Sequence, residues 1–215
     1  MIIGIDHITY SSMDFDKDVQ FFINKGYELE FKDYNIYNAL VKKNFLQNYK
    51  DTQSIALLKK KDSVKIEVIQ DTNKQEGISI MKPLNYNSDD DNLHINKIEI
   101  NVYNPEIFIK EWCKYGFKLI DESTLIFKSL GTNNACLTVY IHKCAELKSY
   151  YLDNKGYVCL ALISTSIERD YMYYKSQGIF VSEIEEVYLI DNTRKVKVFF
   201  LRGSNNEMIE IIGVR

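Results

Sequence analysis

One spacing occurs three times in this chain and constrains its fold more than any other feature. Three sets of residues share separations of seven and then twelve positions: His7, Asp14 and Gly26; Lys97, Asn104 and Gly116; Cys159, Ser166 and Gly178. In each set an apolar run contains or adjoins the first residue, the second can cap a helix, and the glycine ends an amphipathic stretch. Such a repeat predicts one small unit of structure used three times.

The segment after each capping residue has the pattern of an amphipathic helix. In the first segment, Phe15, Val19 and Phe22 fall on one face. Pro105 suits the first turn of the second helix, and Thr165 and Glu168 have the spacing of a capping box in the third. We therefore predict helices over 14–25, 104–115 and 166–177.

Runs of alternating apolar residues after each helix predict strands. The segments 131–139 and 203–211 match in residue type, as a turn followed by a strand, and 61–69 has the same alternation. Glu67, Thr138 and Glu210 thus occupy equivalent positions. Each unit is then a strand, a helix and three strands, or βαβββ. We predict modules at 1–71, 95–143 and 157–215, a linker at 72–94, an insertion at 34–53, and pairing of modules two and three as one domain.

Composition excludes several classes of protein. A formal net charge of -3 gives no general attraction to nucleic acid. The four cysteines, Cys113, Cys136, Cys144 and Cys159, form no Cys-x-x-Cys pair, so we expect free thiols in a reducing compartment. The sequence shows no apolar run of membrane-spanning length and no signal-peptide pattern at its start. We expect a soluble cytoplasmic protein with neither nucleic acid nor a membrane as its partner.

A βαβββ repeat that begins with Ile-Asp-His-Ile (5–8) and ends with Ile-Glu-Val (66–68) resembles the glyoxalase/bleomycin-resistance/extradiol-dioxygenase superfamily, also called vicinal oxygen chelate. The resemblance covers nearly the whole chain. It implies an α+β fold in which βαβββ modules form cup-shaped mixed sheets with helices on the outer face. In that family metal ligands come from the first strand of a module, usually His, and from the last, usually Glu.

Strand alternation agrees with this resemblance. If Ile8 and Tyr10 face the helix, His7 points to the opposite face, which lines the cavity. Glu67 and Glu210 likewise lie between apolar neighbours that face the helices, and a carboxylate there is costly without a partner. The resemblance implies that His7, Glu67 and Glu210 bind a divalent metal ion such as zinc, nickel, manganese or iron.

The pairing of the modules decides which ligands meet. Modules two and three together would form a cup without the usual ligands, lined by Lys97, Glu99, Thr138, Tyr140, Cys159 and Glu210. Module one would then dock alongside, or pair with its twin in a homodimer that joins two copies of His7 and Glu67. If modules one and three pair instead, the set is His7, Glu67 and Glu210, with Cys159 as a fourth candidate. Cys159 can also be interpreted more simply, as a small buried hydrophobic residue that binds no metal. Glu210 likewise has a simpler interpretation, as the partner of Lys97 in a structural ion pair.

Two functions follow as hypotheses. The first is a glyoxalase-like, metal-dependent isomerase, epimerase or lyase that moves a proton on a small oxygenated metabolite through an enediolate, with Glu67 or Glu210 as the base. The second is a metal-free protein that binds a small molecule, such as an antibiotic or metabolite, as in the bleomycin-resistance branch. Because an unpaired module leaves a sheet edge open, we expect a homodimer or an internal docking of module one.

Overall fold

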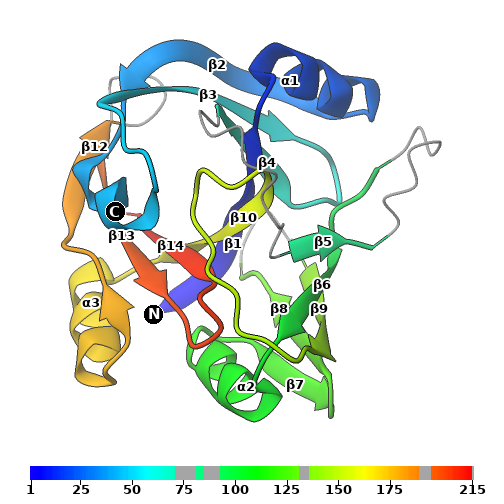
Figure 1. The fold of residues 1–215 in the computed structure, drawn as a ribbon, viewed down its shortest axis with the longest axis vertical. Coiled ribbons are helices and arrows are strands. Elements are labelled where there is room, and N and C mark those ends of the chain that lie inside the picture. The colour runs from blue at the N-terminus through cyan, green and yellow to red at the C-terminus, as the bar shows by residue number, and fades with distance from the viewer. Residues whose placement is uncertain (71–80, 85–92, 131–135, 189–194, 215) are drawn as a thin grey trace.

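Fourteen strands of the computed structural model form one mixed sheet that is flanked by three helices (Figure 1). The structure describes residues 1–70, 81–84, 93–130, 136–188 and 195–214. Three βαβββ modules follow one another along the chain, which confirms the predicted α+β class. None of the helices in the described residues is long and apolar enough to cross a membrane.

Module one begins with the strand that carries His7. Its elements are β1 (Ile2–Ser12), α1 (Phe15–Asn24), β2 (Glu28–Tyr37), the 3-10 helix η1 (Leu40–Phe45), β3 (Thr52–Lys59) and β4 (Lys65–Gln70). The first and last strands, β1 and β4, are parallel neighbours. Helix α1 begins where the Asp14 side chain accepts a hydrogen bond from the Lys17 amide, and Gly26 follows its end with a φ of +84°, as the sequence predicts.

Module two repeats this arrangement. It contains β6 (Lys97–Val102), α2 (Pro105–Lys114), β7 (Lys118–Asp121), β8 (Thr124–Lys128) and β9 (Cys136–Lys143). Asn104 caps α2 by accepting a hydrogen bond from the Ile107 amide at 3.2 Å, and Gly116 has a φ of +99°. The turn predicted at the start of 131–139 lies outside the described residues.

Module three has the same order, with its second strand in two pieces. It contains β10 (Gly156–Ser164), α3 (Ile167–Ser176), β11 (Phe180–Val181), β12 (Glu185–Tyr188), β13 (Lys195–Arg202) and β14 (Met208–Gly213). The predicted capping box of α3 is wrong. Thr165 donates to the backbone oxygen of Met1, and Glu168 pairs with Lys197. Each side chain has found a tertiary partner that local spacing could not reveal.

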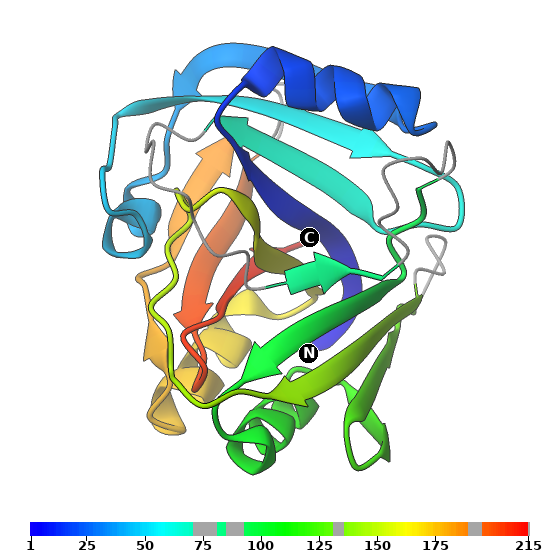
Figure 2. The ribbon, with the colours of Figure 1, turned by 45° about the vertical axis from the view of Figure 1, so that its right-hand side comes forward.

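The first strands of modules one and three meet at the centre of the sheet (Figure 2). β1 and β10 are antiparallel neighbours, with Ile8 opposite Leu160 and Thr9 opposite Cys159. The structure therefore departs from the expected pairing of modules two and three. Because module one closes its sheet against module three within the chain, its edge needs no second copy of the protein. A homodimer stays a prediction.

Module two attaches to this pair at several places, and two of them involve β5 (Met81–Pro83) and the turn between β13 and β14. β5 lies inside the segment that we expected to be a linker, and it joins β6 to the start of β10. The turn between β13 and β14 forms the second contact. There Trp112 of α2 donates from Nε1 to the fully buried carboxylate of Glu207 at 2.7 Å, and Glu111 accepts from the Ser204 amide at 2.9 Å.

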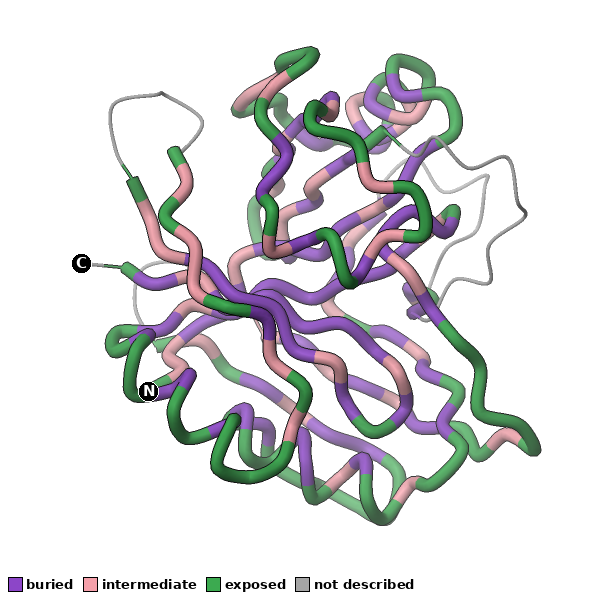
Figure 3. The backbone as a smooth tube through the Cα atoms, turned by 60° about the vertical axis from the view of Figure 1, so that its left-hand side comes forward, coloured by how far each residue is buried: buried purple, intermediate pink, exposed green. Residues whose placement is uncertain are grey.

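Side-chain faces follow the predicted alternation. Figure 3 shows burial concentrated in the central strands, with exposed residues in the peripheral loops. Ile8, Ile66 and Ile209 are fully buried on the strands that carry the candidate ligands. Tyr10 packs edge-on against Phe22 of α1, with ring centroids 5.3 Å apart. The neighbouring His7, on the other face of β1, is thereby directed away from the helix.

Candidate functional site

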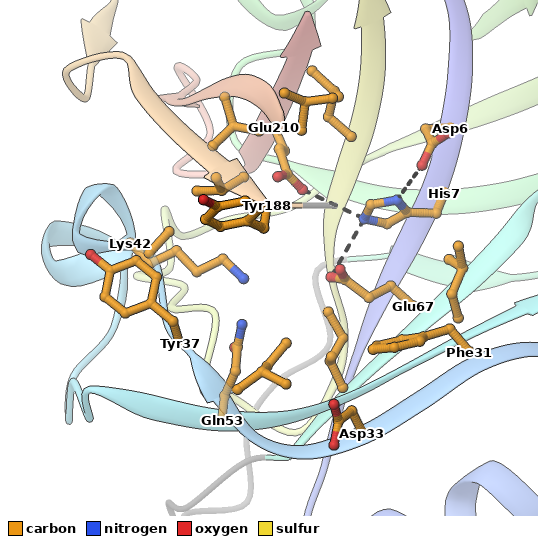
Figure 4. Close-up of a pocket in the computed structure, with 18 of the residues that line it drawn as sticks. Asp6, His7, Phe31, Asp33, Tyr37, Lys42, Gln53, Glu67, Tyr188 and Glu210 are labelled. Carbon is orange, nitrogen blue, oxygen red and sulfur yellow. Dashed lines mark hydrogen bonds and ion pairs between the residues drawn. The ribbon is translucent and has the colours of Figure 1, made fainter. Parts of the chain in front are cut away.

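Modules one and three enclose a cavity of about 550 Å³ (Figure 4). Its walls come from strands of both modules and from η1, and none of its lining residues belongs to module two. His7 of β1, Glu67 of β4 and Glu210 of β14 all line it. The structure therefore brings together the three side chains that the sequence analysis selected, although they are far apart in the chain.

The three side chains converge at one point. Nε2 of His7 lies 3.4 Å from Oε2 of Glu67 and 3.5 Å from Oε2 of Glu210. Candidate ligand atoms of the three residues all lie within 4.8 Å of one another. His7 is only 4% exposed and Glu210 8%, so the cluster is held away from bulk water.

Asp6 fixes the orientation of the imidazole. Its Oδ2 atom lies 2.8 Å from Nδ1 of His7, so this nitrogen carries the proton that forms the hydrogen bond. Nε2 is then directed at the two glutamates, where it has no hydrogen-bond partner among the described residues. A carboxylate on the far nitrogen is the arrangement that commonly orients a metal-binding histidine.

The charges of the cluster depend on one another. Burial by itself lowers the pKa of His7, but Glu67, Asp6 and Glu210 more than offset that effect and raise the pKa well above its usual value. Burial likewise opposes the ionised form of Glu67, yet His7 lowers its pKa to about 2. The protein without a metal thus holds a positive imidazole between carboxylates. A divalent cation can replace the proton on Nε2, and its two positive charges would offset the two carboxylates.

The donor set fits a divalent transition metal. Tetrahedral coordination with bonds of about 2.1 Å places neighbouring ligand atoms about 3.4 Å apart. The separations from His7 Nε2 to the two carboxylate oxygens match this value. One imidazole and two carboxylates are donors that suit zinc, nickel, manganese and iron.

Glu67 and Glu210 occupy equivalent positions in their modules but have different neighbours. Glu67 lies beside Thr9 in the sheet, and Glu210 lies beside Ala161 at the equivalent place. The Thr9 hydroxyl donates to Oε2 of Glu67 at 3.1 Å, whereas Ala161 has no group to donate. Among the described residues, His7 is the one ion-pair partner of the Glu210 carboxylate, which has no hydrogen-bond donor equivalent to Thr9.

Cys159 occupies the position in module three that His7 has in module one. It is fully buried, and its Sγ atom lies 3.9 Å from the Leu160 oxygen. Burial, together with the charges of Glu210 and Glu67, raises the pKa of this thiol well above its usual value. The residue is therefore a neutral thiol outside the group of three convergent ligands, as the plainer interpretation predicts.

The candidate residues of module two lie elsewhere. Lys97 and Thr138 are neighbours on β6 and β9, and Glu99 lies 3.6 Å from His142. None of the four lines the cavity. The suggested ion pair between Lys97 and Glu210 is therefore absent from the described contacts, and Glu210 faces His7 instead.

Sequence reasoning missed several polar residues of the cavity, among them Asp6, Lys42 and Gln53. Asp6 stands directly before His7, and this adjacency was the available signal. Lys42 and Gln53 belong to the predicted insertion, where no periodicity or motif marks them. Lys42 sits on η1 with 8% exposure, and Gln53 sits on β3.

Comparison with known proteins gives likenesses of fold. No family model matches the sequence, and the search of curated proteins finds no match. Methylmalonyl-CoA epimerase from Mycobacterium tuberculosis aligns over 100% of this chain and 89% of its own, with 11% identity and a TM-score of 0.46. A hypothetical protein from Bacillus halodurans aligns over 99% and 94%, with 15% identity and a TM-score of 0.45. Glyoxalase I from Zea mays aligns over 98% and 67%, with 12% identity and a TM-score of 0.40.

Proposed function

We propose that this chain, which has the fold of the glyoxalase/bleomycin-resistance/extradiol-dioxygenase superfamily, is a metal-dependent isomerase, epimerase or lyase that acts on a small oxygenated metabolite. His7, Glu67 and Glu210 are the proposed ligands of the metal. One observation carries this proposal. The buried Nε2 atom of His7 has no hydrogen-bond partner among the described residues, and it faces two carboxylate oxygens at 3.4 and 3.5 Å.

The arrangement suits catalysis better than a purely structural metal. Three protein ligands leave coordination positions for a substrate, whereas structural sites are usually closed by four. A divalent ion bound there would polarise a substrate carbonyl and make the neighbouring C–H bond more acidic. The cavity beside the ligands has room for a small molecule.

The unequal contacts of the two glutamates divide their roles. Glu67 is held by the Thr9 hydroxyl and by His7, and its pKa of about 2 makes it a weak base. The Glu210 carboxylate has only the ion pair with His7 among the described residues, so it can turn toward a substrate more freely than the Glu67 carboxylate. We assign Glu67 to metal binding and Glu210 to both metal binding and proton transfer between neighbouring carbons.

Metal uptake is the first test. The purified protein is stripped with a chelator, titrated with Zn²⁺, Ni²⁺ and Mn²⁺ by calorimetry, and analysed for bound metal. We expect one ion per chain, and we expect His7→Ala to lower the affinity at least about 10-fold. His142→Ala is the matched control, because that histidine is exposed and outside the cavity. A parent protein that binds no ion, or a His7→Ala variant that binds as well as the parent, would contradict the proposed site.

Proton transfer is the second test. Exchange of carbon-bound hydrogen in hydroxyacetone and dihydroxyacetone is followed in deuterated water by NMR with the metal-loaded protein. Glu210→Gln should slow this exchange by at least about 100-fold. Glu67→Gln should mainly weaken metal binding. Loss of exchange in Glu67→Gln at full metal occupancy, with Glu210→Gln still active, would reverse the two assignments.

A metal-free binding protein is the second candidate, and one observation favours it. A protonated His7 lies within ion-pair distance of both Glu67 and Glu210, so the buried charges are neutralised without a metal. On this alternative the cavity binds its ligand by hydrogen bonds and apolar contact alone. Ligand binding that is unchanged by chelator treatment, in a protein that takes up no ion, would favour it.

A further inference from the structure

The cavity contains a second polar group, at some distance from the three candidate ligands. Lys42 extends from η1 into the cavity, and Gln53 extends from β3 toward the same region (Figure 4). The Lys42 residue is only 8% exposed. No described residue accepts a hydrogen bond from its ammonium group or pairs with it within 4.0 Å. Its one described contact is with the ring of Phe200, whose centroid lies 5.9 Å from Nζ.

The ammonium group of Lys42 is available to a ligand in the cavity. Most of the residue is buried, and a distant aromatic face is only a weak partner for its three N–H donors. The side-chain amide of Gln53 also has no hydrogen-bond partner among the described residues. The ammonium group and the amide thus lie in one part of the cavity, and neither has a hydrogen-bond partner among the described residues.

The position of Lys42 is fixed from outside its own module. Glu185 of β12 accepts hydrogen bonds from the Tyr37 hydroxyl and the Val41 amide, both at 2.9 Å. Asp153 accepts from the amides of Gln47 and Asn48, also at 2.9 Å. These contacts tie both ends of the η1 segment to residues outside module one. The backbone that carries Lys42 is therefore held in place before a ligand arrives, which lowers the entropy lost on binding.

Lys42 is the charged residue of the lining that is best placed to meet an anionic group. A divalent ion would offset the charges of Glu67 and Glu210, and Asp6 accepts a hydrogen bond from His7. Lys65, the other lysine of the lining, is tied to Glu30 at 2.8 Å, and Asp33 accepts from the Tyr34 amide. Lys42 has no ion-pair partner among the described residues, so it can pair with one carboxylate of a ligand.

We propose that Lys42 and Gln53 bind the carboxylate of an anionic substrate whose other, oxygenated end reaches the metal. This inference rests on the proposed function for the metal end alone. The lining of the same cavity also contains apolar side chains, among them Ile36, Ile55, Leu57 and Val198. The substrate is therefore a short carboxylic acid with a hydroxyl or carbonyl group at the far end of an apolar chain.

Matched ligands test this assignment. Malate and 2-hydroxybutyrate share a metal-binding hydroxy acid, but only malate has a second carboxylate. 2-Hydroxyglutarate and 2-hydroxypentanoate form a longer pair with the same difference. Binding is measured by calorimetry in the metal-loaded protein. We expect at least one diacid to bind about tenfold more tightly than its partner, the usual effect of a charge-assisted hydrogen bond.

Variants separate Lys42 from its surroundings. Lys42→Met keeps most of the apolar stem, and it should abolish the preference for the diacid while metal uptake stays unchanged. Lys65→Met is the matched control from the same lining and should preserve the preference. Equal binding of diacid and monoacid by the parent, or a preference that survives Lys42→Met, overturns the proposal. If the preference is lost only in Lys65→Met, then Lys65 is the cation that binds the second carboxylate. That result would also overturn the proposal for Lys42.

The same titrations in chelator-treated protein keep the two proposals distinct. If the parent binds no metal, the metal-dependent function fails. The role of Lys42 is then judged by whether the metal-free protein prefers each diacid and loses that preference in Lys42→Met. Metal uptake without any preference for the diacids would contradict the proposed role of Lys42. The proposed metal site would be unaffected by that result.

Discussion

Replacing Glu207 with Gln should change how the stability of the protein depends on pH. Glu207 is fully buried where module three contacts module two, and its two oxygens accept from Trp112 Nε1 at 2.7 Å and from the Asn205 amide at 2.9 Å. Glu111, which accepts from the Tyr115 hydroxyl, lies in the same cluster. Burial and the charge of Glu111 raise the pKa of Glu207 from 4.5 to about 7.

The magnitude follows from that difference. One pH unit corresponds to about 1.4 kcal/mol, so the full effect is about 3 kcal/mol. The folded protein keeps a proton on Glu207 that the unfolded chain has lost between about pH 4.5 and pH 7. The contribution of this group to the free energy of unfolding is therefore largest below pH 4.5. It falls as the pH rises through the window and levels off above pH 7.

Urea unfolding of the parent and Glu207→Gln at pH 5 and pH 8.5 measures the effect. The amide can accept only one of the two hydrogen bonds, and that loss is the same at both pH values. Relative to the parent, the variant should therefore gain about 2 to 3 kcal/mol between pH 5 and pH 8.5. Glu106→Gln, at an exposed position of α2, should show no such change. An equal difference between parent and Glu207→Gln at both pH values would refute the reasoning.

Three further outcomes follow from individual contacts. Asp6→Asn should weaken metal affinity about 10-fold in calorimetric titration, because Asp6 Oδ2 orients the imidazole from 2.8 Å. Gly203→Ala should lower the free energy of unfolding by about 1 to 3 kcal/mol, because the new Cβ would lie 2.3 Å from Oε1 of Glu207. Glu185→Ala should reduce the preference for diacids at unchanged metal uptake, because it removes the hydrogen bonds that position the segment bearing Lys42.

Each of these variants has a matched control. Asp33→Asn changes a carboxylate in the same lining without a contact to the imidazole, so metal affinity should stay at the parent value. Gly4→Ala places its Cβ 3.5 Å from Ile163 Cδ1, an ordinary contact, and should leave stability nearly unchanged. Glu186→Ala removes a carboxylate that pairs with Lys195 beside Glu185, and it should leave the diacid preference intact. A control that changes as much as its partner contradicts the corresponding prediction.

Local signals predicted the repeating elements well. Caps at Asp14 and Asn104 and glycines with positive φ at Gly26 and Gly116 depend on residues within one or two turns of a helix, so a sequence pattern can reveal them. The capping of α3 could not be predicted in this way. Its N-terminal region is held by Met1, which is distant in sequence and near in space.

The pairing of the modules had no local signal. β1 and β10 are separated by most of the chain, and the short connection between modules two and three favoured a different pair. Strand alternation nevertheless placed His7, Glu67 and Glu210 on one face of their strands, and the structure brings the three together. Lys42 escaped prediction because it lies on a 3-10 helix whose position depends on a residue of module three.

The described residues of module two contain no candidate ligand set, yet the module contacts the turn that leads into the strand of Glu210. Lys97 and Thr138 stand at its two ligand positions, and neither lines the cavity. Its helix α2 instead supplies Trp112 to Glu207, which directly precedes β14 and lies three residues before Glu210. A buried hydrogen bond at that point restrains the start of the strand on which the proposed proton-transferring carboxylate is carried. On the proposed function, module two therefore supports Glu210 rather than supplying chemistry of its own.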